Sequence, residues 1–128
     1  DVYKRQVYMK EQTLPHNHGC DEEKIREHMP GEGEISGVSD AMKQLGVPSR
    51  LRIFWLLCHC EECVLNIASL VDMSSPAVSH HLRLLKNSGL IISRRSGKEM
   101  YYRAADTELV KVLHQTIETL AKITCPKD

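Results

Sequence analysis

Apolar residues repeat at three-to-four spacing through much of the chain after residue 50, which predicts consecutive helices. One stripe of RLRIFWLLC is apolar, and Pro48 with Ser49 opens this helix. In the next segment, VLNIASLVDM, the apolar residues Ile67, Leu70 and Val71 keep the helical spacing. We expect the stripe of the first helix to be buried: Leu51, Ile53, Phe54, Leu56 and Leu57.

A tight turn leads from there into a further helix, SSPAVSHHLRLLKNSGL. Ser74 or Ser75 is the expected N-cap, and Pro76 suits the first turn because its missing N–H costs nothing there. Gly89 ends the helix. Two short helices joined by a tight turn, the second polar on its outer face, are typical of a helix-turn-helix. The expected inward stripe is Val78, Leu82 and Leu85.

After Gly89 the pattern becomes that of strands. LIISRRSGKEMYYRAA has β-branched and aromatic residues on both sides of the Ser96-Gly97 turn, which predicts a two-stranded wing. Asp106 or Thr107 then starts a last helix that runs to about Thr124. Its apolar face is wider than one small core needs, so we expect part of it to pack against a second copy. That face contains Leu109, Val112, Leu113, Thr116, Ile117 and Leu120.

The beginning of the chain reads differently. We interpret residues 1–8, which open with DVYKRQ, as a non-native leader, and residues 9–34 as a mobile N-terminal arm with a short helix in DEEKIREHM. PGEGEISG is expected to be a linker, with Ser39 capping a helix in DAMKQLG. Residues 35–124 then form the winged helix-turn-helix domain with its C-terminal dimerisation helix.

The zero net charge of the 128 residues conceals an uneven distribution. Residues 20–34 contain six acidic residues against Lys24 and Arg26, whereas residues 73–103 contain six basic residues against Glu99 alone. A local positive excess suits a polyanion such as double-stranded DNA. The first residues of a recognition helix meet base edges, and wing arginines meet phosphates. The expected DNA contacts are Ser75, Ser79, His80, His81, Arg83, Lys86, Arg94, Arg95 and Lys98.

No apolar run is long enough to span a membrane, and no export signal is visible, so we expect a cytoplasmic protein. Five cysteines in such a chain are free, metal-bound or redox-active in the reducing cytosol. Neither a glycine-rich phosphate loop nor a nucleophile elbow occurs in the sequence. We therefore expect a DNA-binding regulator and not an enzyme.

The stretches LGVPSRLRIFWLL, SSPAVSHHLRLLKNSGLI and SRRSGKEMYYR closely resemble the metal-sensing transcriptional repressors of the ArsR/SmtB family, from about Ile35 to Leu120. CDEEKI and ISGVSDAMKQL are closest in pattern to its cadmium/lead-responsive CadC type. The resemblance implies a mainly α fold with a small β-hairpin, a winged helix-turn-helix that dimerises through its N- and C-terminal helices. It also implies a repressor that leaves operator DNA when it binds a soft metal ion such as Cd, Pb or Zn.

The resemblance also assigns metal ligands. The first cysteine of the family's Cys-x-Cys pair falls on Cys63, but the second falls on Leu65, which cannot bind a metal. Cys60 or Cys58 is then the candidate for the missing sulfur. In the arm, the family's cysteine pair is replaced by ligands of mixed type: Cys20, His16 and His18. Thiolates favour Cd, Pb, As(III) or Zn, and imidazoles favour Zn and Cd.

Several alternatives stay open. Cys58, Cys60 and Cys63 have the spacing of a three-thiolate arsenic(III) site, and the same thiols suit a redox switch or a structural zinc site. Cys58 is equally a small buried apolar residue. A second family site keeps Asp106 but has Glu108, Thr119 and Lys122 at its other positions, so we interpret it as lost. We interpret His114 and Glu118, which could replace it, as an ordinary pair on a helix surface.

Overall fold

The computed structural model describes residues 14–125. The expected leader lies outside the described residues. The chain divides after Ser39 into two units, and each is described below by itself. In the described part of the chain, no helix is long and apolar enough to cross a membrane.

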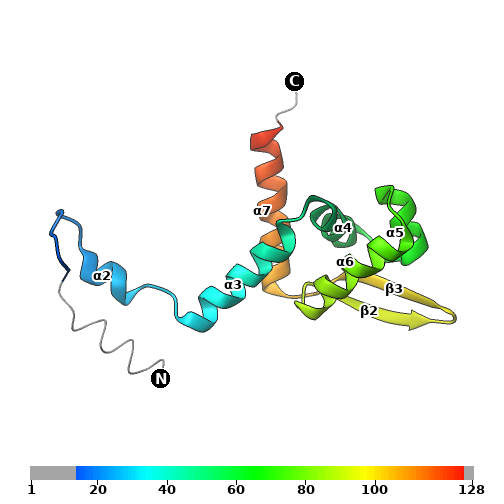
Figure 1. Cartoon of the computed structure of the whole chain (residues 1–128), viewed down its shortest axis with the longest axis horizontal. Coiled ribbons are helices and arrows are strands. Elements are labelled where there is room, and N and C mark those ends of the chain that lie inside the picture. The colour runs from blue at the N-terminus through cyan, green and yellow to red at the C-terminus, as the bar shows by residue number, and fades with distance from the viewer. Residues whose placement is uncertain (1–13, 126–128) are drawn as a thin grey trace. The chain divides into compact units, whose positions relative to one another are not determined.

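The first unit contains the short helix α2, Glu22–Glu27 (Figure 1). The side chain of Asp21 caps it by accepting a hydrogen bond from the backbone N–H of Lys24 at 3.2 Å. Two acidic residues, Glu22 and Glu23, occupy the first turn, where their negative charges interact favourably with the positive end of the helix dipole. The prediction of a short helix in DEEKIREHM is confirmed.

The expected linker in PGEGEISG is wrong, because helix α3 covers Glu32–Leu45 without a break. Ser39 lies inside this helix and does not cap it. Gly33 lies in the first turn of α3. Gly37 lies in its interior and costs about 1 kcal/mol relative to alanine. Acidic residues in the first turn, Glu32 and Glu34, favour the helix. The glycines also conceal a helical apolar spacing in the sequence: Ile35, Val38, Met42 and Leu45.

In the second unit, α4 and the helix-turn-helix follow the expected pattern. Pro48 opens α4, the turn between α5 and α6 places Asp72 in the left-handed region at φ 55, and Ser74 caps α6 through the N–H of Ala77 at 3.3 Å. Gly89, at φ 75, follows the end of α6. The bounds are Pro48–His59 for α4, Val64–Val71 for α5 and Ser75–Asn87 for α6.

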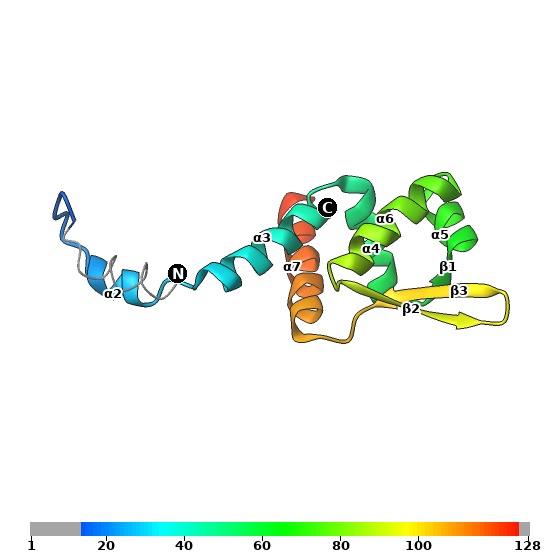
Figure 2. The same cartoon turned by 60° about the horizontal axis from the view of Figure 1, so that its bottom comes forward.

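The wing consists of β2, Ile91–Ser96, and β3, Glu99–Ala104, which pair antiparallel around Gly97 at φ 63. In both views the hairpin extends past the helices (Figures 1 and 2). A third strand, β1, covers Glu62–Cys63 and pairs with β3, so the strand order is β1-β3-β2. The sequence pattern misses β1 because two residues are too few for a strand periodicity.

The core joins α4, α5, α6, the sheet and α7, Glu108–Thr124. Thr107 caps α7, as expected, through the N–H of Val110 at 3.2 Å. Only part of the predicted α7 face is covered: Leu113 and Ile117 pack against the core. The large apolar side chains that stay exposed on α7 are Leu109, Val112, Leu120 and Ile123, at 45–69%. The buried core residues include Ile53, Phe54, Leu57, Ile67, Val71, Val78, Leu82, Leu85, Leu90, Ile91 and Val110.

Candidate DNA-binding surface and metal ligands

Helix α6 presents a polar outer face because its apolar residues point into the core. Val78, Leu82 and Leu85 are at most 1% exposed. The opposite face carries exposed side chains that can donate hydrogen bonds to base edges and phosphates. These exposed residues are Ser79, His80, Arg83 and Lys86, and Ser75 is partly exposed at the first turn.

The two histidines of α6 lie in different surroundings. His80 is exposed, and its Nδ1 lies 3.1 Å from a guanidinium nitrogen of Arg83. His81 is half-buried, and its Nδ1 has no hydrogen-bond partner among the described residues. Burial lowers the pKa of His81, and the charges of Arg50 and His80 lower it further. His81 therefore favours its neutral form, which weakens it as a phosphate contact.

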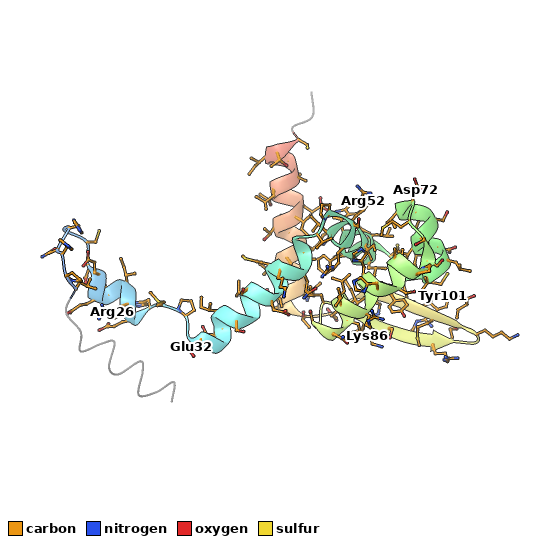
Figure 3. All side chains as sticks on the ribbon, in the orientation of Figure 1. Arg26, Glu32, Arg52, Asp72, Lys86 and Tyr101 are labelled. Atoms are coloured by element: carbon orange, nitrogen blue, oxygen red, sulfur yellow. The ribbon has the colours of Figure 1, made fainter. Side chains whose placement is uncertain are left out.

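Lys86 connects α6 to the wing. Its ammonium nitrogen donates a hydrogen bond to Oγ of Ser93 on β2 at 2.7 Å. Figure 3 labels Lys86 on α6 and Tyr101 on β3, the neighbouring strand of the wing. The hydrogen bond links α6 directly to β2 of the wing.

The basic residues of the wing differ in how they are engaged. Arg95 and Lys98 are exposed near the hairpin turn. Arg94 instead forms a two-pronged contact with Glu61, with Nε 2.9 Å from each carboxylate oxygen, and its guanidinium lies 5.0 Å from the ring centre of Tyr101. The hydrogen bond from Arg94 lowers the pKa of Glu61. Sequence reasoning missed Glu61, since nothing in its local pattern indicates a partner 33 residues away.

Cys63 lies where the wing meets the helix-turn-helix. It ends β1, opposite Tyr101 of β3, and it is also the N-cap residue of α5. Its side chain is buried, at 9% exposure, and makes no capping hydrogen bond. A change in the position of Cys63 would therefore act on the wing and on the first helix of the helix-turn-helix together.

The other two cysteines of CHCEEC, Cys58 and Cys60, have raised pKa values and keep their protons to higher pH than free thiols do. Burial, and then the carboxylate of Glu118, raise the pKa of Cys58 to about 11. Burial and then Glu62 raise the pKa of Cys60, whose thiol donates to the carbonyl of Leu56 at 3.5 Å. A metal ion would have to displace a proton from each of them.

The structure does not gather the three thiols of CHCEEC into one cluster. Within residues 14–125, the single group of three or more His, Cys, Asp or Glu ligand atoms lying within 4.8 Å of one another is that of His59, His114 and Glu118. The reason is local: α4 ends at His59, and the chain then continues in extended form through Cys60 to Cys63. Extended backbone spreads these side chains apart.

The candidate ligands of the arm lie in the first unit and are all exposed. The rings of His16 and His18 stack with centres 5.7 Å apart, and the side chain of Asn17 accepts a hydrogen bond from the N–H of Gly19 at 3.0 Å. Cys20 immediately precedes the capping residue of α2. The arm thus presents a thiol and two imidazoles within five residues, all accessible to solvent.

Comparisons with known proteins identify the family of the chain. Residues 47–93 match the family described as bacterial regulatory protein, arsR family. A transcriptional repressor SmtB homolog from Synechocystis sp. is 32% identical over 104 residues, which cover 77% of this chain and 76% of the relative. A cadmium resistance transcriptional regulatory protein CadC homolog from Staphylococcus aureus is 40% identical over 77 residues, 59% of this chain and 63% of the relative.

The fold is also found among solved structures. The homodimeric winged helix-turn-helix DNA-binding domain of a protein from Mycobacterium bovis has a TM-score of 0.65 and 31% sequence identity, and the match covers 76% of this chain and 94% of that one. The predicted fold class, a mainly α winged helix-turn-helix with a small β-hairpin, is confirmed, and β1 extends the hairpin to three strands. The chain belongs to the ArsR family of bacterial regulatory proteins.

Proposed function

We propose that this protein is a homodimeric transcriptional repressor that binds double-stranded operator DNA and leaves it when a soft metal ion binds. The relatives named above are a transcriptional repressor and a cadmium resistance regulator. The DNA-binding surface would be the outer face of α6 together with Arg95 and Lys98 of the wing, which are exposed. Phosphate contacts of this kind make affinity depend on salt concentration.

The observation that carries this proposal is the position of Cys63. It belongs to β1, which pairs with β3 of the wing, and it directly precedes α5. Two residues before it, Glu61 holds Arg94 of β2. A metal ion on Cys63 would therefore act on both parts of the DNA-binding surface through covalent and hydrogen-bonded neighbours.

The proposed metal site has two halves. Cys63 with Cys60 or Cys58 forms one half, and Cys20 with His16 or His18 from the arm of the partner subunit forms the other. Thiolates with added imidazoles favour Cd, Pb or Zn. Because the thiols of Cys58, Cys60 and Cys63 do not lie together, a site completed from the arm is favoured over a local three-thiolate site for arsenic(III).

The proposed dimer uses the exposed apolar residues of α7. Four large apolar side chains of that helix, all at least 45% exposed, form a face that a single copy leaves in water. Two recognition helices related by a twofold axis would then reach successive major grooves about 34 Å apart. A metal ion releases DNA only if it binds the DNA-free conformation more tightly than the DNA-bound conformation. The coupling free energy between two such sites is typically about 1–3 kcal/mol.

The test is operator binding, measured by fluorescence anisotropy under reducing conditions on a duplex selected from a random-sequence pool. Titration with Cd(II), Pb(II), Zn(II) and As(III) identifies the effector. Cys63→Ser should keep DNA binding and lose metal-driven release, as should Cys20→Ser or removal of residues 9–20. Cys125→Ser, at an exposed cysteine after α7, is the matched control.

The outcomes separate the alternatives. Release by As(III) that survives loss of the arm but requires Cys58, Cys60 and Cys63 would replace this site with a three-thiolate site. Release by oxidants alone would indicate a thiol switch. A melting temperature that falls with chelator, with no change in DNA affinity, would indicate structural zinc. Unchanged metal response in Cys63→Ser would overturn the proposal.

A further inference from the structure

Three side chains from two helices converge outside the cysteine stretch. His59 is the last residue of α4, and His114 and Glu118 lie one turn apart on α7. The two imidazole Nε2 atoms lie 3.1 Å apart. Oε1 of Glu118 lies 3.2 Å from Nε2 of His114 and 3.4 Å from Nε2 of His59. The three ligand atoms form a nearly equilateral triangle.

Hydrogen bonds alone cannot satisfy this triangle. Each imidazole nitrogen has one in-plane position, which holds either a hydrogen or a lone pair. If His114 donates to Glu118, the same nitrogen has no lone pair left to accept from His59. If His59 donates to Glu118, it likewise cannot donate to His114. One of the three short contacts therefore always lacks a hydrogen bond directed along it.

A metal ion satisfies all three atoms at once, because it takes one lone pair from each. In a tetrahedral zinc site, with metal–ligand bonds of about 2.0–2.1 Å, neighbouring ligand atoms lie about 3.3–3.4 Å apart. The distances of 3.1, 3.2 and 3.4 Å fit one face of such a tetrahedron. Two imidazoles and one carboxylate are also a known ligand set for zinc.

Neighbouring groups hold the three ligands in place. Trp55, one turn before His59 on α4, donates its indole N–H to Oε1 of Glu118 at 3.2 Å. Its ring lies 4.3 Å from the ring of His59, which in turn meets the ring of His114 edge-on at 4.7 Å. Hydrogen bonds from outer groups to metal-binding carboxylates orient them and raise metal affinity. Trp55 would thus orient Glu118 and His59 for the metal ion.

The site is open to an ion in solution. The side chains of His59, Glu118 and His114 are 44%, 36% and 28% exposed. His59 and His114 also line a cleft of about 330 Å³, which leaves room for water as a fourth ligand. The exposure indicates an ion that exchanges with solution, in contrast to a permanently buried structural metal.

We propose that His59, His114 and Glu118 form a second metal site, free of thiolate, for Zn(II). It links α4 to α7 within one subunit and so stiffens the helix that carries the exposed apolar face. It uses none of Asp106, Glu108, Thr119 and Lys122, the positions of the lost family site, and none of the five cysteines. Its oxygen and nitrogen ligands suit Zn(II), whereas the thiolates of the cysteine site also favour the softer ions Cd(II) and Pb(II).

The test uses the full chain with Cys20, Cys58, Cys60 and Cys63 changed to serine, so that only the proposed site remains. Titration with Co(II) should give d–d absorption of a tetrahedral ion at one equivalent per subunit, without a thiolate charge-transfer band, and Zn(II) should displace it. His114→Gln and Glu118→Gln should each weaken binding about tenfold or more, and Trp55→Phe about tenfold. His28→Ala, which removes an exposed histidine of the first unit, is the control.

Should the serine variant fail to fold, the chain with its cysteines answers the same question by stoichiometry. His114→Gln should then bind one Zn(II) fewer per subunit than the parent, while Cd(II) charge-transfer absorption at the cysteines stays unchanged. Equal zinc stoichiometry and affinity in parent and variant would overturn the inference. If the parent shows no Cd(II) charge-transfer band, that result counts against the cysteine site alone. Failure of the proposed function and failure of this inference are therefore distinguishable.

Discussion

Arg94 on β2 and Glu61 in the CHCEEC stretch form a two-pronged ion pair, with Arg94 Nε 2.9 Å from both carboxylate oxygens. The same guanidinium is one of the cations expected to contact DNA phosphates. In the protein without DNA, Arg94 is bound by the carboxylate of Glu61, which lies in the sequence between two candidate metal ligands, Cys60 and Cys63. The pair connects the stretch that holds the proposed metal ligands to the proposed DNA-binding surface.

The first prediction concerns this pair. Glu61→Gln should free Arg94 for a phosphate, so DNA affinity should rise and the slope of log affinity against log salt should steepen by about one unit. The measurement is anisotropy on one duplex at several salt concentrations. Glu99→Gln removes an equal charge near the wing turn without releasing Arg94, so its slope should stay that of the parent. A Glu61→Gln slope equal to that of Glu99→Gln would contradict the role of the pair.

The second prediction compares two neighbouring arginines. Arg95 is exposed, whereas Arg94 is engaged by Glu61 and lies over Tyr101. Arg95→Ala should therefore reduce the slope of log affinity against log salt by about one unit. Arg94→Ala should reduce it by less, because Arg94 of the parent must leave Glu61 before it can contact a phosphate. Lys111→Ala, on α7, is the control. Equal slopes for all three variants would place the DNA-binding surface elsewhere.

Periodicity and capping residues were sufficient to predict the helix-turn-helix, the wing and α7. Buried stripes such as Val78, Leu82 and Leu85, and turn residues such as Gly97, act locally, so a short window of sequence contains them. The same local reading failed at the start of α3, where glycines concealed a helical stripe, and at β1, which is too short to show a period.

The relationships that matter most for the sites could not be predicted, because they join residues far apart in the chain. Glu61 and Arg94 are 33 residues apart, and His59 and His114 are 55 apart. The first pair depends on β1 and β2 both pairing with β3, and the second on α4 packing against α7. No window of sequence records either. His114 and Glu118 were visible as a helical pair, but the third member, His59, is brought to them only by the fold.

The third prediction concerns the exposed face of α7. Leu120 is 54% exposed although it is a large apolar residue. Leu120→Glu would place a charge in the proposed dimer interface, so sedimentation should show a monomer at micromolar concentration, with DNA affinity lowered accordingly. Leu65→Glu, at a 66% exposed position on α5, makes the same change outside that face and should leave the dimer intact. A dimeric Leu120→Glu would place the interface on another surface.

The last prediction concerns the pH dependence of Cys58. Burial and then Glu118 raise its pKa to about 11, from an ordinary value of 9.0. The fold thus favours the protonated thiol, and this contribution to stability is complete below pH 9 and is lost as the pH rises through about 11. Since the thiolate is the reactive form, iodoacetamide should modify Cys58 of the metal-free protein slowly at pH 8 and progressively faster towards pH 11.

Mass spectrometry of the Cys58 peptide measures this rate, and the same peptide in the urea-unfolded chain is the matched control. Unfolding removes the burial and the nearby Glu118, so there the rate should level off near the ordinary pKa of 9.0. Glu118→Gln in the folded protein should lower the pKa of Cys58 by only part of the shift, because burial is the larger cause. Identical rate profiles for folded and unfolded chains would show that the thiol of Cys58 is not desolvated, and a metal ion would then bind it without displacing a tightly held proton.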